Sequence, residues 1–341
     1  MKNNRKLDHI RICLDKDVES GDTGFGKFRL KHMASPEINF DDICMEIKFF
    51  GKKLSYPIII EAMTGGIKEA KKINHEVAEI AQEFGIGFGV GSQRIIFDNN
   101  FKHLKNDIAN NIVDSFNVRS IAPDVLLIAN LGAVQLNYGY GVRECSIAVD
   151  SINADALALH LNPLQEVIQP EGNRNFSGLI EKINKIAKEL KKPVIVKETG
   201  CGISYEIAKK LKVDAIDVAG SGGTSWGLIE GYRRKNILYK NISKLFSSWG
   251  IPTALAIKEV SKLNVPIIGS GGIRNGLDAA KALALGANCV GMALPILRAW
   301  SIGGKQEVRK FLEGFIFELK IAMFLTGSRK VSEIKGKIEQ I

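Results

Sequence analysis

The sequence predicts an α/β fold, a (β/α)₈ TIM barrel with an N-terminal segment before the barrel. Three observations lead to this prediction: apolar runs of strand length recur, amphipathic helical patterns separate them, and polar or glycine residues follow nearly every run. Several runs contain no polar residue before their last positions, which is typical of parallel strands that are buried on both faces. Eight such units favour a closed barrel over a doubly wound sheet.

The eight apolar runs have the length of strands. In chain order they cover residues 56–62, 85–91, 124–131, 154–161, 193–198, 215–220, 266–270 and 289–295. Pro57, Pro193 and Pro266 stand at the start of three runs, where a missing N–H does little harm. Residues 177–192 and 275–287 place apolar side chains at the spacing of amphipathic helices. These patterns alternate as a barrel requires.

Two segments depart from the simple repeat. Residues 1–55 precede the first strand, and we expect them to form a segment that caps one barrel end and contacts substrate, or an arm to a neighbouring subunit. The barrel itself is expected to span residues 56–341. Residues 221–251 are longer than an ordinary loop between a strand and its helix, and an insertion of this length is commonly a lid or an interface element.

The composition excludes several classes of protein. A 45% hydrophobic share over 341 residues is enough for a core and argues against a disordered chain. The formal charge of +10 favours anionic ligands such as phosphates, but no basic block typical of a nucleic-acid tail occurs. The five cysteines are scattered without a CxxC pair, and neither a signal peptide nor a membrane span is recognisable. We therefore expect a cytoplasmic protein with neither nucleic acid nor membrane as a partner.

The unusual residues lie where a barrel places its chemistry, at the carboxyl ends of the strands. Residues 63–66 follow the first run and residues 92–94 follow the second. Asn130 ends the third run, residues 160–166 continue from the fourth, and Lys197 ends the apolar part of the fifth. A purely structural barrel would need only short turns at these positions. The pattern therefore predicts an active site at this end.

Two glycine-rich loops point to a phosphate group. Residues 220–224 (GSGGT) follow the sixth run and residues 269–272 (GSGG) lie at the end of the seventh, with Arg274 just beyond. Glycine lets the backbone approach an anion closely, and the N–H groups of a following helix favour phosphate. Tight turns alone would explain one such loop, but two of them favour a phosphate-bearing ligand.

Lys197 and the residues after the fourth strand are the clearest candidates for chemistry. Lys197 should point into the barrel mouth, where it needs an anion, a polarised ligand or a carboxylate such as Glu198. His160 and Asn162 share a face at a strand end, and Gln165 and Glu166 follow in the turn. Glu166 offers a hard oxygen ligand to an Mg²⁺ ion that bridges a phosphate.

A basic cluster lies near the start of the chain and consists of Arg5, Lys6, His9 and Arg11. It has two interpretations. One is a solvated terminus, and the other is a basic flap over the barrel mouth. Cys201 and Cys289, which lie beside strand ends, are expected to be small packing residues.

The motifs together resemble one family, the type II isopentenyl-diphosphate isomerases. The matching segments, in family order, are RKLDHI, AMTGG, GVGSQR, ANLGA, HLNPLQE, QPEGNRNFSG, VIVKETGCGIS, DVAGSGGTSW, WGIPTA and SGGIRNGLDAAKALALGA. They extend over essentially the whole chain. The resemblance implies a (β/α)₈ barrel that binds FMN and interconverts isopentenyl and dimethylallyl diphosphate, with Mg²⁺ and reduced flavin. It also implies NADPH as the reductant and a homo-oligomer, either a tetramer or an octamer.

The resemblance assigns roles to residues of this sequence. Residues implied to bind substrate are Arg5, Lys6, Ser92, Gln93, Arg94, His160, Asn162 and Gln165. Those implied to contact FMN are Ala62, Met63, Thr64, Ser92, Asn130, Lys197, Thr224, Gly271, Gly272, Arg274, Ala293 and Leu294. Glu166 is the implied Mg²⁺ ligand, and Gln165, His160 and Lys197 are the implied catalytic residues.

Two positions depart from the family pattern. Ala219 stands where many members carry a serine near the flavin, so one hydrogen bond is expected to be missing. Asn173 and Asn175 replace residues that are often acidic, which is expected to alter a loop without removing a catalytic group.

The implied reaction constrains the mechanism. A shift of the double bond adds a proton at C4 and removes one from C2, with no net oxidation. An alkene is a poor base, so the acid must lie against it in a pocket without water. Neutral Gln165 has no proton at a useful pKa, which leaves the reduced flavin as the better acid and base, with Lys197 stabilising its anion.

Two other classes of function remain as alternatives. One is another FMN barrel oxidoreductase, such as a 2-hydroxy-acid oxidase or a nucleotide dehydrogenase. The first of these needs a histidine base with an arginine clamp and the second needs a catalytic cysteine loop, and neither pattern is evident in SGGIRNG or around Cys201. The other is a basic binding protein without enzymatic activity, which leaves the polar strand ends unexplained.

Overall fold

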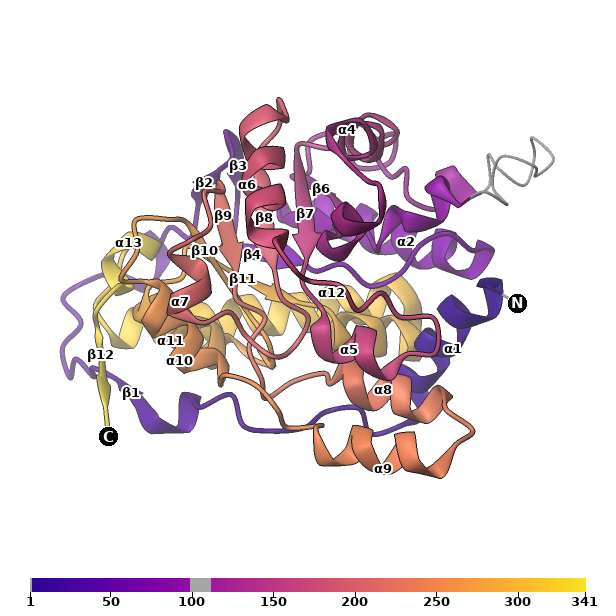
Figure 1. Cartoon of the computed structure of the whole chain (residues 1–341). Coiled ribbons are helices and arrows are strands. Elements are labelled where there is room, and N and C mark those ends of the chain that lie inside the picture. Colours follow the sequence, from indigo (N-terminus) through magenta and orange to yellow (C-terminus); the bar gives the residue numbers. More distant parts are fainter. Residues whose placement is uncertain (1, 99–111) are drawn as a thin grey trace.

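The computed structural model describes residues 2–98 and 112–341 and contains the predicted closed barrel (Figure 1). In chain order the strands are β4 (Ile58–Ile60), β5 (Gly87–Gly89), β6 (Leu127–Gly132), β7 (Ala156–His160), β8 (Val194–Lys197), β9 (Ala215–Asp217), β10 (Ile267–Ser270) and β11 (Cys289–Met292). All are parallel, and β11 pairs with β4 through Val290 and Ile58, so the sheet closes on itself. All eight predicted strands are confirmed, each somewhat shorter than its apolar run.

Helices surround the barrel and cover the outer face of the strands (Figure 1). They are α2 (Lys68–Phe84), α4 (Val142–Asp150), α6 (Leu179–Glu189), α7 (Tyr205–Ala208), α10 (Thr253–Val260), α11 (Gly276–Leu285) and α12 (Leu294–Leu325). The short helix α5 (Pro163–Ile168) lies instead at the carboxyl end of β7. The two helices predicted at 177–192 and 275–287 are α6 and α11. Short 3₁₀ helices, η3 (Gln93–Phe97) and η5 (Ala133–Tyr138), follow β5 and β6.

The first 55 residues contact both ends of the barrel. Helix α1 (Lys2–Asp15) packs on α8 and α12 at the carboxyl ends of the strands. The hairpin of β2 (Ile47–Phe49) and β3 (Lys52–Leu54) lies at the opposite end, where Phe49 and Leu54 pack against the apolar side chains inside the barrel. Between them lie η1 (Phe25–Lys27), β1 (Phe28–Leu30) and η2 (Phe40–Asp42).

The end of the chain returns to this N-terminal segment. After α12 come α13 (Val331–Ile334) and β12 (Ile338–Gln340). Strand β12 pairs antiparallel with β1, with Phe28 opposite Gln340. The pairing ties the C-terminal strand to residues 28–30 on the outside of the barrel.

The long segment 221–251 folds into a helical pair, α8 (Trp226–Arg233) and α9 (Ile237–Leu245). Helix α8 packs on α5 and on α1, so it forms a wall of the barrel mouth. Helix α9 lies outside it (Figure 1) and leaves Leu238 and Leu245 exposed. In the described part of the chain, no helix combines the length and apolarity that a membrane span needs.

Candidate active site

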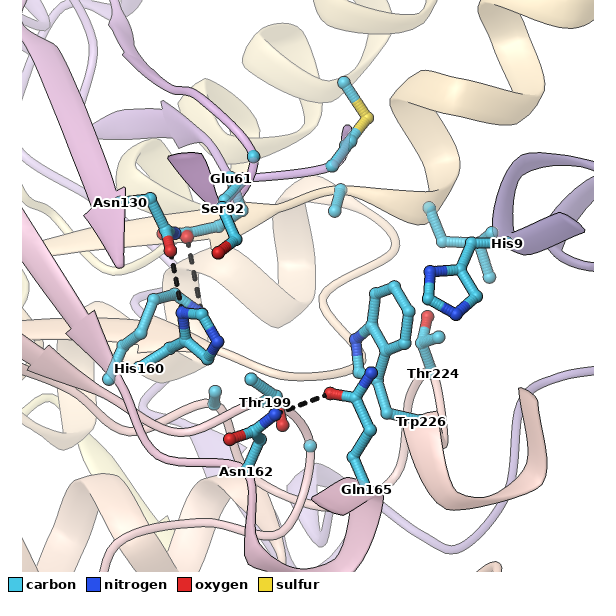
Figure 2. Close-up of a pocket in the computed structure, with 18 of the residues that line it drawn as sticks. His9, Glu61, Ser92, Asn130, His160, Asn162, Gln165, Thr199, Thr224 and Trp226 are labelled. Atoms are coloured by element: carbon cyan, nitrogen blue, oxygen red, sulfur yellow. Dashed lines mark hydrogen bonds and ion pairs between the residues drawn. The ribbon is translucent and has the colours of Figure 1, made fainter. Parts of the chain in front are cut away.

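A cavity opens at the carboxyl ends of the barrel strands and brings most of the predicted site residues together (Figure 2). The predicted residues that line it are Arg5, Lys6, Ala62, Met63, Thr64, Ser92, Arg94, Asn130, His160, Asn162, Gln165, Glu166, Lys197, Thr224, Gly271, Gly272, Arg274, Ala293 and Leu294. They come from the N-terminal helix and from the carboxyl ends of all eight strands or the loops that follow them. The prediction of a site at this end is consistent with the geometry.

Gln93 requires a correction, because its side chain does not line the cavity. It is fully buried, its Nε2 donates to the carbonyl oxygen of Ala148 at 2.8 Å, and its Oε1 accepts from the N–H of Asn130 at 3.0 Å. The 3₁₀ helix η3 starts at this residue and turns its side chain away from that of Arg94. The side chain of Gln93 thus supports the strand that carries Asn130, and a contact of Gln93 with substrate would have to come from its backbone.

The two glycine loops pack against each other and form one backbone surface. Gly271 has a φ of +104°, and a Cβ at this position would lie 2.3 Å from the carbonyl oxygen of Gly220. A Cβ on Gly223 would lie 2.4 Å from the backbone nitrogen of Gly272. Helix α12 begins beside this surface at Leu294, so free N–H groups of its first turn face the same region. The surface has the features of a phosphate site.

Two polar atoms in the cavity wall call for a ligand. Thr64 Oγ1 and Asn162 Oδ1 are buried, and neither has a hydrogen-bond partner within the described residues. Buried polar atoms are nearly always paired in native proteins. A flavin, with its carbonyl and N–H edge, and a hydrated metal diphosphate are both able to satisfy such atoms. The residues present therefore fit these groups.

Arg274 already has a partner, which the sequence did not reveal. Its Nε donates to Oε1 of Glu19 at 2.7 Å, and Arg298 donates to Oε2 of the same carboxylate at 2.7 Å. The backbone beside Glu19 is joined to the glycine loop, because the N–H of Ser20 donates to the carbonyl oxygen of Gly223 at 3.0 Å. The N-terminal segment thus reaches the predicted cofactor loops of its own chain.

Lys197 points into the cavity as predicted, but it meets carboxylates there. Its Nζ lies 3.3 Å from Oδ2 of Asp217 and 3.6 Å from Oε2 of Glu61, and it donates to the carbonyl oxygen of Glu198 at 2.9 Å. Burial alone would lower the pKa of Lys197, but Asp217 and Glu61 outweigh it and raise the pKa. The ammonium group therefore stays charged.

Glu198 was the alternative partner of Lys197, and its carboxylate has a different role. One of its oxygens accepts hydrogen bonds from the N–H groups of Thr199 and Gly200, both at 2.6 Å, and from that of Cys201. Burial raises the pKa of this carboxyl to about 7, although these three hydrogen bonds act to lower the pKa. Glu198 thus fixes the loop that brings Thr199 and Gly200 to the cavity wall.

The side chains after β7 form a connected chain of amides and carboxylates. Nδ2 of Asn162 donates to Oε1 of Gln165 at 3.0 Å (Figure 2) and to Oε1 of Glu166 at 3.1 Å. Nε2 of Gln165 donates to Oε1 of Glu230 on α8 at 3.1 Å. The amide of Gln165 is thereby held in one orientation between two elements.

Glu166 fits an Mg²⁺ ion as a single carboxylate. Its side chain is 4% exposed and lines the cavity. The N–H of Asn173 donates to its Oε2 at 2.5 Å, so the substituted loop residue holds Glu166 through its backbone. No cluster of three or more His, Cys, Asp or Glu able to hold a metal occurs within the described ranges. Mg²⁺ usually takes one or two carboxylates and completes its shell with phosphate and water, so one glutamate suffices.

His160 is neutral in the absence of a ligand. Its Nδ1–H donates to Oδ1 of Asn130 at 2.7 Å (Figure 2), which leaves Nε2 for the cavity. Burial lowers the pKa of His160 to about 3, and the charges of Lys197, Lys6 and Arg94 add to the effect. An anion placed among these cations would oppose the shift.

Helix α1 carries the basic cluster to the cavity. Nζ of Lys6 donates to the carbonyl oxygen of Ser92 at 3.4 Å, and Arg5 pairs with Glu171 at 3.4 Å. His9 lies edge-on to the ring of Trp226, 5.1 Å between centroids (Figure 2), and bonds to Glu230 at 2.8 Å. These residues favour the interpretation as a flap over the mouth rather than a solvated terminus.

Sequence reasoning missed two further residues, Trp226 in the cavity wall and Glu230 behind it. Trp226 lines the cavity, and Glu230 lies one helical turn further along α8 and is fully buried. Burial alone would raise the pKa of Glu230, but hydrogen bonds from His9 and Gln165 and the charge of Arg233 lower it to about 2. The i, i+4 spacing of the two residues in the long insertion was the available signal.

Comparisons with known proteins support the fold and assign a family. Residues 153–340 match the family described as FMN-dependent dehydrogenase. The solved structure of a mandelate oxidase is similar with a TM-score of 0.64 and 16% identity, covering 98% of this chain and 95% of that one. At this identity the likeness shows the fold alone.

Other relatives share a much higher identity with this chain over nearly its whole length. The isopentenyl-diphosphate delta-isomerase of Ignicoccus hospitalis is 47% identical, over 98% of this chain and 92% of the relative. That of Nostoc sp. is 45% identical, over 99% of this chain and 96% of the relative. Together with the match to an FMN-dependent family, these identities show that the chain belongs to the FMN-dependent, type II family of isopentenyl-diphosphate delta-isomerases.

Proposed function

We propose that the cavity at the barrel mouth binds isopentenyl diphosphate beside reduced FMN and converts it to dimethylallyl diphosphate, and the reverse. The observation that carries the proposal is that one cavity joins the basic residues of α1 to the glycine loops and to the buried, unpaired polar atoms of the strand ends. A diphosphate and a flavin phosphate need separate anion sites, and both are available here. An oxidase of 2-hydroxy acids has no use for the first of them.

FMN would lie among residues at or after the carboxyl ends of strands β4, β5, β6, β8, β9, β10 and β11. The residues that would hold it are Ala62, Met63, Thr64, Ser92, Asn130, Lys197, Thr224, Gly271, Gly272, Arg274, Ala293 and Leu294. The chemistry that the bound cofactor would supply is donation of a proton to C4 of the alkene and removal of a different proton from C2. The backbone N–H groups of Gly271, Gly272 and the first turn of α12 suit its phosphate.

The diphosphate of the substrate would be held at the α1 side of the cavity. Arg5, Lys6 and Arg94 would supply positive charge, and Glu166 would hold an Mg²⁺ ion that neutralises the diphosphate. His160 would complete this wall once the anion favours protonation of its Nε2, and the unpaired Oδ1 of Asn162 would accept a hydrogen bond from a water of the hydrated metal. This remote binding energy orients the alkyl part of the substrate for reaction.

The remaining side chains keep the reacting alkene in place and dry. Trp226, Ile10 and Leu297 line the cavity with apolar surface. This surface keeps water away from the alkene, which is a poor base. Gln165 is fixed between Asn162 and Glu230, so its amide presents a constant polar edge to the substrate. His160 and Gln165 thus act by position, and Lys197 keeps a positive charge near the cofactor.

Deuterium incorporation tests the proposed reaction. The protein is reduced without oxygen, supplied with Mg²⁺ and isopentenyl diphosphate in heavy water, and the product is examined by mass spectrometry. We expect dimethylallyl diphosphate that carries deuterium at its new methyl group, since the added proton comes from an exchangeable group. Recovery of unchanged substrate, or of an oxidised product, would overturn the proposal.

Three properties complete the proposal. NADPH serves as the reductant that prepares the flavin and is not consumed in each turnover. The chain forms a homo-oligomer, a tetramer or an octamer, which light scattering of the purified protein measures. The protein acts in the cytoplasm, in keeping with scattered cysteines that lack a disulfide pattern.

A further inference from the structure

Three ionisable side chains meet in a buried cluster at the inner wall of the cavity. Glu61 follows β4, Lys197 ends β8 and Asp217 ends β9, and each is at most 9% exposed. Lys197 and Glu61 line the cavity itself (Figure 2 labels Glu61). Neither carboxyl group has a part in the function proposed so far. A buried charge is costly unless it is paired, so two carboxylates beside one ammonium group call for an explanation.

The contacts within the cluster indicate a shared proton. Oδ1 of Asp217 accepts from Oγ of Ser270 at 2.5 Å and from the N–H of Ala219 at 3.3 Å. Its Oδ2 is buried and lies 3.3 Å from Nζ of Lys197, and Oε2 of Glu61 lies 3.6 Å from the same Nζ. Two buried carboxyl groups thus share one ammonium group, which neutralises only one of them, and a proton on the other removes the excess negative charge. A proton on Glu61 leaves the cluster with one positive and one negative group.

The neighbouring strand leaves room for the Glu61 carboxyl. Gly291 in β11 has no side chain, and a Cβ there would lie 2.6 Å from Oε1 of Glu61. Glu61 is also fixed by its backbone, because its N–H donates to the carbonyl oxygen of Met292 at 2.8 Å. The carboxyl group therefore occupies a space that β11 leaves open.

We propose that Glu61 is a positioning residue that acts on the flavin through Lys197. Glu61 carries the proton that keeps the cluster of Glu61, Lys197 and Asp217 neutral beside the reduced cofactor, and it releases that proton when the flavin is oxidised. The proposal rests on the binding of FMN in this cavity. It adds to the proposed function a control of the net charge of the cluster beside the flavin.

The charges of the cluster follow from its surroundings. Burial raises the pKa of Glu61 to about 8, Asp217 adds to the shift, and Lys197 opposes it. Below this pH the cluster holds one positive and one negative group and is neutral, and above it the cluster is negative. Cys289 faces Glu61 from β11 and stays a neutral thiol, since burial raises its pKa well above the ordinary value.

Reduction of the flavin changes this equilibrium. Two electrons and one proton convert FMN to its reduced anion, and a new negative charge near the cluster raises the pKa of Glu61 further. In a pH range around 8, Glu61 is therefore ionised before reduction and protonated after it. Reduction then takes up two protons for two electrons in this range, and one proton at lower pH.

The test is a redox titration of the bound flavin without any substrate. The midpoint potential of the holoprotein is recorded from pH 6 to pH 9.5 for the wild type, for Glu61→Gln and for Glu79→Gln. Glu79 is an exposed glutamate that pairs with Lys305, so its variant is the matched control. The slope against pH gives the number of protons taken up for each pair of electrons.

We expect the wild type and Glu79→Gln to change from one proton to two near pH 8, and Glu61→Gln to stay at one throughout that range. Glu198, whose pKa is raised to about 7, is present in all three proteins, so it does not produce this difference. A wild type that takes up one proton at every pH overturns the proposal even if Glu61→Gln does not fold. A Glu61→Gln variant with the wild-type slope also overturns it. Failure of the proposed isomerisation would instead appear in the substrate assay, with the titration unaffected.

Discussion

Lys6 shows how the cavity changes the chemistry of a single residue. Burial and the neighbouring Arg5 lower the pKa of Lys6 to about 7, because both disfavour its positive charge. In the free enzyme Lys6 is thus charged below pH 7 and becomes neutral above it. A bound diphosphate restores the charge, so binding above pH 7 must take up a proton.

This predicts a pH-dependent KM that Lys6→Arg removes. Above pH 7 the KM for isopentenyl diphosphate should rise by up to about tenfold per pH unit in the wild type. An arginine stays charged throughout this range, so Lys6→Arg should lack that rise. Steady-state kinetics of both proteins from pH 6 to 9 provide the measurement. Parallel KM profiles would show that Lys6 does not contact the diphosphate.

Glu166 is the second prediction at the scale of the residue. Glu166→Gln should retain FMN, since no predicted cofactor contact is lost, but its activity should fall by more than the ~10–100-fold that loss of an outer partner of a metal costs. The Mg²⁺ concentration for half-maximal activity should rise. Glu181→Gln, an exposed change on α6, should leave both quantities unchanged. Wild-type Mg²⁺ dependence in Glu166→Gln would refute the assignment.

Glu19 connects two elements of the site through ion pairs. Glu19 bridges Arg274 in the loop after β10 and Arg298 in α12. Removing its charge should free Arg274 to move and weaken FMN binding by about 5-fold, or ~1 kcal/mol, as expected for a partly exposed pair. Fluorescence titration of Glu19→Gln with FMN measures this, with Asp41→Asn, which lies on an exposed turn, as the control. Equal affinities would assign the bridge no part in the site.

The close approach of the two glycine loops gives a prediction for Gly271. Gly271→Ala adds a Cβ where the carbonyl oxygen of Gly220 lies, at a positive φ, so the loops must separate. We expect loss of FMN and a destabilisation of at least ~1–3 kcal/mol. Gly314 lies on helix α12, and in Gly314→Ala the new Cβ would have no neighbour outside its own helix within 4 Å among the described residues, so the free energy of unfolding should rise by ~0.5–1 kcal/mol. Thermal unfolding with and without FMN compares them, and a Gly271→Ala protein that binds FMN normally would contradict the packing.

At the scale of the whole molecule, the barrel could be predicted because each strand carries its own local signal. Runs such as 193–198 are apolar on both faces, and each precedes an amphipathic pattern. The observed strands are shorter than these runs because pairing with neighbouring strands decides where a strand stops. The sequence does not state that pairing. The polar residues at the strand ends could be placed on one rim for the same reason.

Features that depend on distant contacts could not be predicted. Glu19 and Arg274 are 255 positions apart, and Glu61 meets Lys197 across the barrel. Gln93 sits between two cavity residues in the sequence, but the turn at η3 rotates it toward α4. Trp226 and Glu230 belong to an insertion whose packing on α1 follows from tertiary structure alone.

The stoichiometry of the reductant tests the central claim most directly. The two diphosphates are isomers of equal oxidation state, so reduced flavin is needed but no reductant is consumed. Under anaerobic conditions with FMN and Mg²⁺, one NADPH per active site should support many turnovers, and photoreduced FMN should replace NADPH altogether. Oxidation of one NADPH for each product molecule formed would contradict the account and assign the protein to the oxidoreductases.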